Sequence, residues 1–385
     1  MRIRFLNAGD SHGEGLVGIV EGLPAGVRLR TATIERALMR RRRSYGRSSR
    51  QMVERDEVKI LSGVWKMHTT GAPVAILIPN RGRVVQGRRG GALGTIPRPG
   101  HADLPGVLKY GHDTIPPVSE RASARSTAMR VAIGSIAGKV LHELGVDVLG
   151  HVLSIGNVCA APPTGRDLRA LRRRIERSSV FTADGSAARK MVNVIHQARA
   201  AGNSIGGSVE VIATGLAAGI GSHVMWDRKL DARLSAATMS IQSVKAVAIG
   251  DGLSSHLLPG IDAHDAMTIR GAGVVRSSNH AGGIEGGMTN GEPVIVRAFA
   301  KPIPTAQRRA KTFNLRTLKD TSSPYVRSDT CVIPALSVIA EMVVSWELLR
   351  AVLDKFGGDH IDDTRAALAH YRKRVKQRLR KPGTR

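Results

Sequence analysis

The chain has 385 residues, of which 42% are hydrophobic, and its 58 basic and 31 acidic residues give a net charge of +27. That length allows one large domain or a few smaller ones, and no apolar run approaches the roughly 18 residues of a membrane span. The N-terminus lacks the apolar core of a signal peptide, and the two cysteines, Cys159 and Cys331, argue against a disulfide framework or a zinc site. We therefore expect a cytoplasmic protein whose charge attracts anionic partners.

The expected elements mix strands and helices without a strict βαβ rhythm, which favours an α+β fold. Runs rich in β-branched residues predict strands at 58–64, 74–78, 208–214 and 293–296. A short helix is expected over 33–40, and a long one begins at Ser119 as N-cap and ends at Gly145. Further helices are expected over 334–356, ended by Gly357 and Gly358, and over 362–379. With no Pro/Ser-rich linker, we expect one compact domain over 1–358 and a basic C-terminal helix or tail over 359–385.

Four segments are too rich in glycine, histidine or arginine for simple packing. GDSHG at 9–13 places a histidine, the natural proton donor near neutral pH, between small residues. RRRSYGR at 41–47 groups arginines beside a glycine, which suits phosphate or carboxylate oxygens. RPGHAD at 98–103 is followed by ERASAR at 120–125. SNHAGGIEGGMTNG at 278–291 contains glycine pairs that allow the backbone to approach a flat or phosphorylated ligand.

Each segment also has a plainer interpretation. A lone histidine is more often structural, and a basic loop can be solvated or contact nucleic acid. The basic runs over 166–177 and 372–385 are expected to be solvated helix faces. The sequence has no Walker A motif, no G-x-G-x-x-G after a strand and no HExxH. Together the segments predict a pocket lined by arginine and histidine for an organic phosphate.

With KPIPT at 301–305 and RSDTC at 327–331, these segments resemble the chorismate synthase family, in the family's order and from residue 1 to about 358. The resemblance implies a lyase that eliminates phosphate, in the 1,4-anti sense, from 5-enolpyruvylshikimate 3-phosphate. The product is chorismate, in the last step of the shikimate pathway to the aromatic amino acids. Reduced FMN is implied as the cofactor, with NADPH as an optional reductant. The implied fold is a β-α-β sandwich of antiparallel sheets around central helices, assembled as a homotetramer.

The resemblance also implies roles for individual residues. His12 would donate a proton near the substrate, His101 would protonate the flavin region, and Asp329 would work with the flavin N5 in removing the substrate proton. The substrate would be bound by Arg41, Arg47, Arg98, Arg125 and Arg327. The cofactor would be bound by Arg121, Ala122, Ser123, Gln242, Ser243, Gly286, Lys301, Pro302, Ile303, Pro304, Thr305 and Arg327, with NADPH at Arg41 and Arg47. No metal is implied.

Some positions depart from the expected family pattern. The stretch 81–97 is short and basic, and Gln51, Ser126 and Gln242 replace commoner residues. These changes remove no catalytic group, but they keep open a diverged flavoprotein that acts on another phosphorylated substrate. The net charge keeps open nucleic-acid binding, although the 3% aromatic content and the lack of helix-turn-helix or zinc-finger spacing argue against it. We expect a small anionic substrate, with no membrane and no specific nucleic-acid partner.

Overall fold

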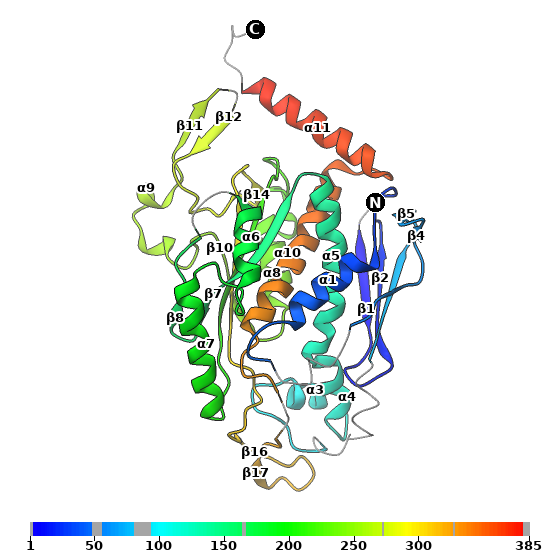
Figure 1. Ribbon diagram of the computed structural model, residues 1–385, viewed down its shortest axis with the longest axis vertical. Coiled ribbons are helices and arrows are strands. Elements are labelled where there is room, and N and C mark those ends of the chain that lie inside the picture. The colour runs from blue at the N-terminus through cyan, green and yellow to red at the C-terminus, as the bar shows by residue number, and fades with distance from the viewer. Residues whose placement is uncertain are drawn as a thin grey trace.

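Helices α1 (Thr31–Arg42), α5 (Thr127–Glu143) and α10 (Ile333–Phe356) lie between two antiparallel sheets (Figure 1). The computed structural model describes residues 3–47, 56–80, 94–163, 167–271, 273–325 and 328–379. Each sheet packs one face against these helices, which removes the apolar side chains on that face from water. The expected α+β class and the β-α-β sandwich are therefore confirmed.

The smaller sheet has the order β1-β2-β6-β3, with β1 (Arg4–Ala8), β2 (Gly15–Glu21), β6 (Val74–Pro79) and β3 (Lys59–Ile60). Along β2, Leu16 and Val20 are buried whereas Ile19 is exposed, as a half-buried strand requires. The strand predicted over 58–64 is wrong in extent, because only β3 forms within it. The chain then continues into a separate hairpin of β4 (Val64–Trp65) and β5 (His68–Thr69). Gly63 interrupts it with a φ of +79°, a conformation that strands do not use.

The larger sheet has the order β10-β15-β9-β7-β8 and covers the other side of the helices. Its strands are β7 (Asp147–Ile155), β8 (Val158–Cys159), β9 (Gly207–Thr214), β10 (Val244–Ile249) and β15 (Val294–Ala300), so the strands expected at 208–214 and 293–296 are confirmed. Val209 and Val211 on β9 are buried against α10. Three further hairpins extend from the sandwich: β11 (Met267–Arg270) with β12 (Gly273–Arg276), β13 (Ile284–Glu285) with β14 (Met288–Thr289), and β16 (Lys311–Phe313) with β17 (Asp320–Ser322).

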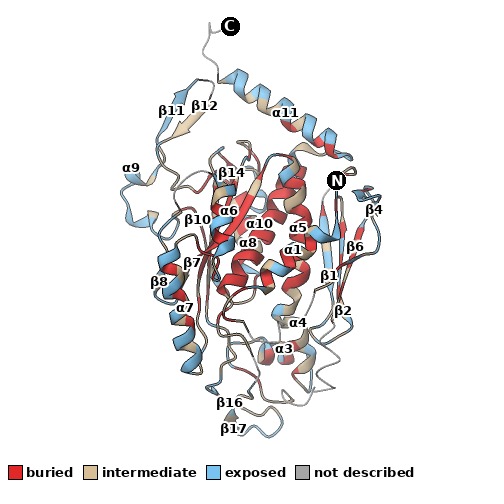
Figure 2. Ribbon diagram, in the orientation of Figure 1, coloured by how far each residue is buried: buried red, intermediate tan, exposed pale blue. Residues whose placement is uncertain are grey.

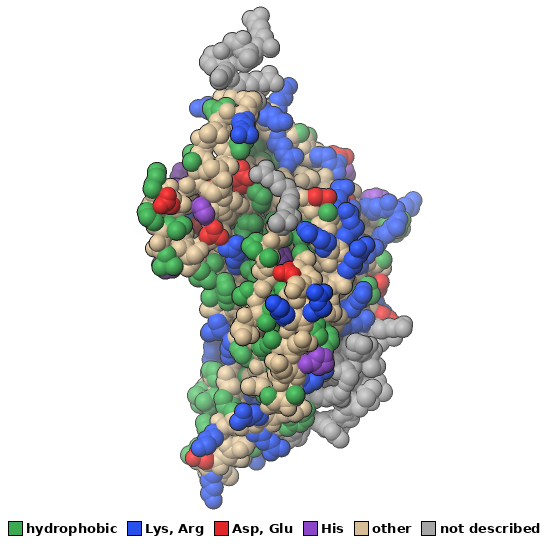
Figure 3. Space-filling model, turned by 60° about the vertical axis from the view of Figure 1, so that its left-hand side comes forward, with side chains coloured by type: hydrophobic (Ala, Val, Ile, Leu, Met, Phe, Trp, Pro, Cys, Tyr) green, Lys and Arg blue, Asp and Glu red, His purple; other side chains and the backbone are tan. Residues whose placement is uncertain are grey.

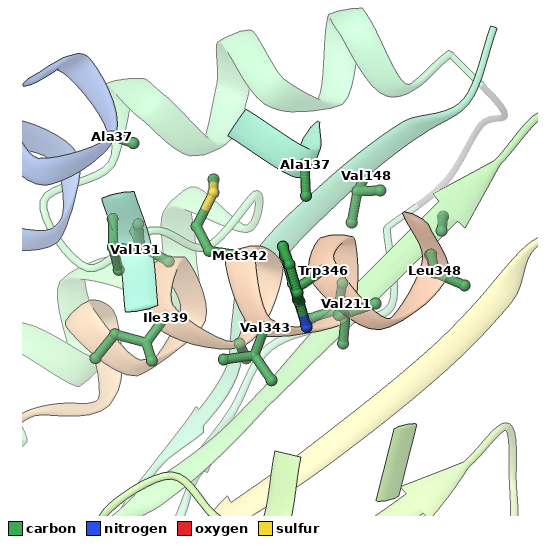
Figure 4. Close-up of a cluster of buried hydrophobic side chains, with 14 of the residues drawn as sticks. Ala37, Val131, Ala137, Val148, Val211, Ile339, Met342, Val343, Trp346 and Leu348 are labelled. Carbon is green, nitrogen blue, oxygen red and sulfur yellow. The ribbon is translucent and has the colours of Figure 1, made fainter. Parts of the chain in front are cut away.

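The core is made of aliphatic side chains, because aromatic residues are only 3% of the chain. Figure 2 shows the burial concentrated in the central helices and in the facing sheet strands. Trp346 on α10 is an exception, and it lies near Val211 and Val343 in Figure 4. Helices α5 and α10 approach closely at Gly134, where a Cβ atom would lie 2.3 Å from the carbonyl oxygen of Met342. Glycine at that position permits the close approach of the two helices.

The helix predicted from Ser119 is wrong at its start. Ser119 lies inside α4 (Pro116–Ala122), which begins at Pro116 because proline fits the first turn of a helix. The chain then becomes extended at Ser123 (φ −57°, ψ 141°), makes a 3₁₀ turn over 124–126 and enters α5. The predicted ends of two helices are confirmed: α5 ends before Gly145, and α10 ends at Gly357. The remaining helices are α3 (Asp103–Tyr110), α6 (Leu168–Arg177), α7 (Gly185–Ala200), α8 (Leu230–Met239), α9 (Gly260–Ala263) and α11 (Ile361–Arg378), with 3₁₀ turns at 226–228 and 255–257.

The two basic segments are largely solvated, as expected, with one exception. On α6, Arg169, Arg173, Arg174 and Arg177 are exposed, whereas Arg172 donates to Glu341 Oε1 (3.2 Å) and to the carbonyl oxygen of Val148 (2.6 Å). A buried carboxylate at the centre of the fold needs such cationic partners, which is why this arginine turns inward. Helix α11 exposes most of its basic residues and docks through Tyr371, which donates to the Ala218 carbonyl at 2.9 Å. The division of the chain at residue 358 stays a prediction.

Candidate active site

The loop between β1 and β2 carries His12. Its first residue, Gly9, has a φ of +109°, and a Cβ atom there would lie 2.2 Å from the Gly15 carbonyl oxygen, so the turn requires glycine. Asn80, which follows β6, donates from Nδ2 to the carbonyl oxygens of Asp10 (2.9 Å) and Gly13 (3.0 Å). The His12 side chain is 47% exposed. The loop is thus fixed at its base while its histidine stays accessible to a ligand.

The last turns of α4 close onto this loop. The carboxylate of Glu120 accepts hydrogen bonds from Ser11 Oγ (2.6 Å) and from the backbone N–H of His12 (2.7 Å), and its Oε1 lies 2.7 Å from His12 Nδ1. Burial alone would raise the pKa of Glu120, but the hydrogen bonds from His12 and Ser11 outweigh it and lower that pKa to about 2. Glu120 is therefore an ionised partner of His12 at neutral pH.

Arg121, Ala122 and Ser123, predicted to hold the cofactor, follow directly on Glu120. The guanidinium of Arg121 donates to the carbonyl oxygens of Asn7 (2.9 Å) and Gly9 (3.2 Å). The hydroxyl of Ser123 accepts from the backbone N–H of Arg125 (3.2 Å). This segment therefore joins the His12 loop to the start of α5.

The second histidine, His101, shares a carboxylate with an arginine. Asp103 is fully buried and accepts from Arg98 Nε (2.7 Å) and Nη2 (2.9 Å), and its Oδ1 lies 2.5 Å from His101 Nδ1. Burial raises the pKa of Asp103, but the hydrogen bonds from Arg98 and His101 hold it well below its usual range. The structure therefore brings the two predicted residues of RPGHAD together, with Asp103 ionised between them.

Three more predicted arginines gather at the start of α5. Arg41 is buried and donates from Nε to Thr127 Oγ1 (3.0 Å). Its pKa is lowered to about 9, first by burial and then by the positive charges of Arg47 and Arg125. Arg47 Nε lies 3.4 Å from Asp329 Oδ2. The mutual repulsion felt by Arg41 means that the cluster has more positive charge than its own carboxylates balance.

Arg125 connects this cluster to the His12 loop. Its Nε donates to Asn80 Oδ1 (3.0 Å), and its Nη1 to Asp56 Oδ1 (2.5 Å). The Asn80 amide therefore accepts a hydrogen bond from Arg125 through its oxygen and donates to the loop carbonyls through its nitrogen. One half-buried side chain thus fixes the position of the arginine cluster relative to His12.

The segment 301–305, predicted for the cofactor, lies beside the same end of α5. Lys301 donates from Nζ to the Gly100 carbonyl (2.8 Å) and from its backbone N–H to the Ser243 carbonyl (2.9 Å). Gln242 Nε2 donates to Ser126 Oγ (3.1 Å). These bonds link the His101 loop, the residues Gln242 and Ser243, and the start of α5 into one site.

The chain is similar to known proteins over nearly its whole length. The chorismate synthase family model matches residues 3–353. The chorismate synthase of Bacillus cytotoxicus is 45% identical over 374 residues, which cover 94% of this chain and 96% of that protein; that of Desulforudis audaxviator is 46% identical over 384 residues, covering 97% and 98%. A crystal structure of chorismate synthase is 34% identical, covers 98% of this chain and 99% of its own, and superposes with a TM-score of 0.81.

The chain belongs to the chorismate synthase family. It is therefore a lyase of aromatic biosynthesis, and the formation of chorismate in the shikimate pathway follows from that membership. The fold and function expected from the sequence motifs are confirmed. The roles of individual residues stay predictions, because a match of whole chains does not test single side chains.

Gly286, also predicted for the chorismate synthase site, is not joined to this cluster. Gly286 lies in the β13–β14 hairpin, next to Gly287, whose carbonyl accepts from the backbone N–H of Leu230 at the start of α8 (2.9 Å). Gln242 follows the other end of α8, and a helix of 10 residues is about 15 Å long. Gly286 is therefore about a helix length away within one chain. Arg327 lies outside the described residues.

The sequence reasoning missed the polar residues that hold the predicted ones. Asp103 had a local signal, because a carboxylate two residues after a histidine can reach its ring. Glu120 had no local signal for this role, since 108 residues separate it from His12. Asn80 and Asp56 had no signal, because their partner Arg125 is brought to them only by folding.

Other surface features lie away from the site. A cavity of about 560 Å³ lies between α6 and α7, and another of about 780 Å³ lies on the face of the larger sheet that points away from α10. No predicted site residue within the described ranges lines either one. Lys and Arg side chains are scattered over the face shown in Figure 3. The part of the chain that the structure describes contains no helix suited to cross a membrane.

Proposed function

We propose that the chain eliminates phosphate from 5-enolpyruvylshikimate 3-phosphate at the start of α5, with reduced FMN as the cofactor. The observation that carries the proposal is the cluster of Arg41, Arg47 and Arg125, tied by hydrogen bonds to the segments that bear His12 and His101. Like charges held this close are costly unless an anion joins them. The substrate has a phosphate and two carboxylates, which match such a cluster.

A neighbouring residue also fits the part of a flavin cofactor that donates hydrogen bonds, such as a ribityl hydroxyl or a ring N–H. Gln242 Oε1 is buried and has no hydrogen-bond partner among the described residues, and an unsatisfied buried acceptor costs about 1–3 kcal/mol. A ligand that donates a hydrogen bond would remove this cost. Reduced FMN, when bound, would lend an electron transiently as phosphate leaves, with no net redox change. It would be held by Arg121, Ala122, Ser123, Gln242, Ser243, Lys301, Pro302, Ile303, Pro304, Thr305 and Arg327. Gly286 would contact the cofactor where assembly of the subunits brings that residue to the site.

The chain's own residues would bind, neutralise and move protons. The clustered arginines would stabilise the negative charge that grows on the leaving phosphate as its C–O bond breaks. The ring proton must leave as the new double bond forms, and Asp329, held 3.4 Å from Arg47 Nε, would take part in its removal. His12 and His101 would donate protons at the substrate and at the flavin.

Anaerobic turnover with reduced FMN tests the proposal, with inorganic phosphate release as the readout. His12→Ala should lower the rate by about 10²-fold to 10⁴-fold, the range typical of a lost proton donor. His142→Ala is the control, because His142 lies near the other end of α5 and pairs with Asp147 on the surface (2.7 Å). No phosphate release by wild-type protein with FMN bound would contradict the proposal.

The source of electrons for the flavin is a separate question. The proposal includes NADPH as an optional reductant at Arg41 and Arg47, and anaerobic turnover with NADPH in place of a chemical reductant tests it. Turnover with the chemical reductant but not with NADPH would mean that the protein does not reduce its own flavin and depends on another system for it.

The assembly and location are also part of the proposal. A homotetramer in the cytoplasm is what the family resemblance implies. Light scattering should give four times the chain mass of 41.1 kDa, and cell fractionation tests the location. If the protein bound FMN tightly but failed to restore growth of a strain lacking this step, a diverged flavoprotein would be favoured instead.

A further inference from the structure

We infer that Glu120 positions His12 for proton transfer and makes Nε2 the ring nitrogen that exchanges the proton. The inference rests on the proposed function, because it concerns how His12 would act in that reaction. Glu120 is called a positioning residue, since it reaches the reaction only through the histidine.

The contacts between the two residues fix both the backbone and the ring of His12. Glu120 Oε2 accepts from the His12 backbone N–H (2.7 Å), and Oε1 lies 2.7 Å from Nδ1 of the same residue. Ser11 Oγ donates to Oε2 at 2.6 Å and so fixes the carboxylate itself. A ring held at Nδ1 and tied through its own backbone keeps few orientations. Nε2 is the ring nitrogen that Glu120 does not hold.

The charge of Glu120 determines which nitrogen carries the fixed proton. With its pKa lowered to about 2, Glu120 is a carboxylate throughout the neutral range and can only accept hydrogen bonds. Nδ1 must therefore carry a hydrogen, and the exchangeable proton is on Nε2.

The loop does not depend on this carboxylate alone for its shape. Arg121 donates to the Gly9 carbonyl in the loop and to the Asn7 carbonyl at the end of β1. Asn80 donates to two more loop carbonyls, and the backbone N–H of Ser11 donates to the Glu120 carbonyl at 3.2 Å. A change confined to the Glu120 side chain leaves all of these bonds in place. Glu120→Gln is therefore expected to fold, and it keeps the size of the side chain while removing its charge.

The chain has a matched control for the pair. His142 Nδ1 lies 2.7 Å from Asp147 Oδ1, the same separation as between His12 and Glu120, but both side chains are on the surface (54% and 40% exposed). Asp147→Asn removes a histidine–carboxylate pair outside the site. Another such pair, Asp103 with His101, is less suitable because Asp103 also binds the buried Arg98.

The test compares pH–rate profiles of wild type, Glu120→Gln, Glu120→Asp and Asp147→Asn, with FMN affinity measured separately. In Glu120→Gln we expect kcat to fall by about 10-fold to 100-fold. The basic limb of its profile should move to lower pH, because glutamine leaves the protonated ring without its ionic partner. Glu120→Asp should recover part of both effects, and Asp147→Asn should match wild type. FMN affinity should be unchanged throughout.

A second measurement does not depend on turnover. Nitrogen-15 NMR of the histidine rings should give His12 in the Nδ1–H form in wild type and a mixture of forms in Glu120→Gln. An unmoved pH profile in Glu120→Gln, or an Nε2–H form in wild type, would overturn the inference while the proposed function stood. Wild-type protein without any turnover would instead refute the proposed function, and the NMR result would still decide the pairing.

Discussion

Replacing Glu341 by glutamine should destabilise the fold, because Glu341 is the carboxylate at the centre of a buried ion cluster on α10. Its side chain is 2% exposed. It accepts two hydrogen bonds from Arg40 (2.9 Å each), one from Arg172 (3.2 Å) and one from the backbone N–H of Gly150 (2.9 Å). The glutamine amide cannot balance the charges of the two arginines.

The magnitude follows from the pKa of Glu341. Burial would raise it, but Arg40 and Arg172 outweigh burial and lower it from 4.5 to about 2. At 1.36 kcal/mol per pH unit this corresponds to about 3 kcal/mol, within the range of about 3–5 kcal/mol for removing one partner of a buried pair. The unfolding entropy of a chain this long is about 0.8 kcal/mol/K, so Tm should fall by roughly 4 °C.

Thermal unfolding at pH 7 measures this shift, and Glu176→Gln is the control. Glu176 lies 3.6 Å from the same Arg40, but its side chain is 45% exposed, so its loss should change Tm by less than about 1 °C. The stabilisation exists above the unfolded pKa and is lost as pH falls from 4.5 to about 2. The difference between wild type and Glu341→Gln should therefore shrink over that window. Equal shifts in both variants at pH 7 would refute the reasoning.

Two further predictions concern packing and thiol chemistry. Gly134→Ala should lower Tm more than Glu341→Gln, because its Cβ atom would lie 2.3 Å from the Met342 carbonyl oxygen. Gly138→Ala on the same helix is the control: its Cβ atom would meet nothing closer than 3.8 Å, so the variant should be neutral or stabilising. Similar Tm values for the two glycine variants would contradict this prediction. Burial raises the pKa of Cys331 to about 12, while Cys159 is exposed. Iodoacetamide at pH 8 should therefore modify one thiol per native chain and two in denaturant, as mass spectrometry can count.

Local patterns located most elements but not every end. The strand β9 and the helices α10 and α11 lie within a residue or two of their expected bounds, because their apolar periodicity and the glycines at 357 and 358 act locally. The cap at Ser119 was wrong because Pro116 starts the helix earlier and the chain extends at Ser123. One residue that favours the N-cap position does not decide where a helix begins when a proline shortly before it can start the helix.

The sequence by itself determined the family and the sandwich class, and it predicted a set of catalytic residues, because its motifs can be recognised from their residues and their order along the chain. Only the tertiary structure decided how those residues are held. It brought Glu120 to His12 across 108 residues and turned Arg172 inward to Glu341. Hydrogen bonds and ion pairs act over a few ångströms in space, and distance along the chain does not encode them.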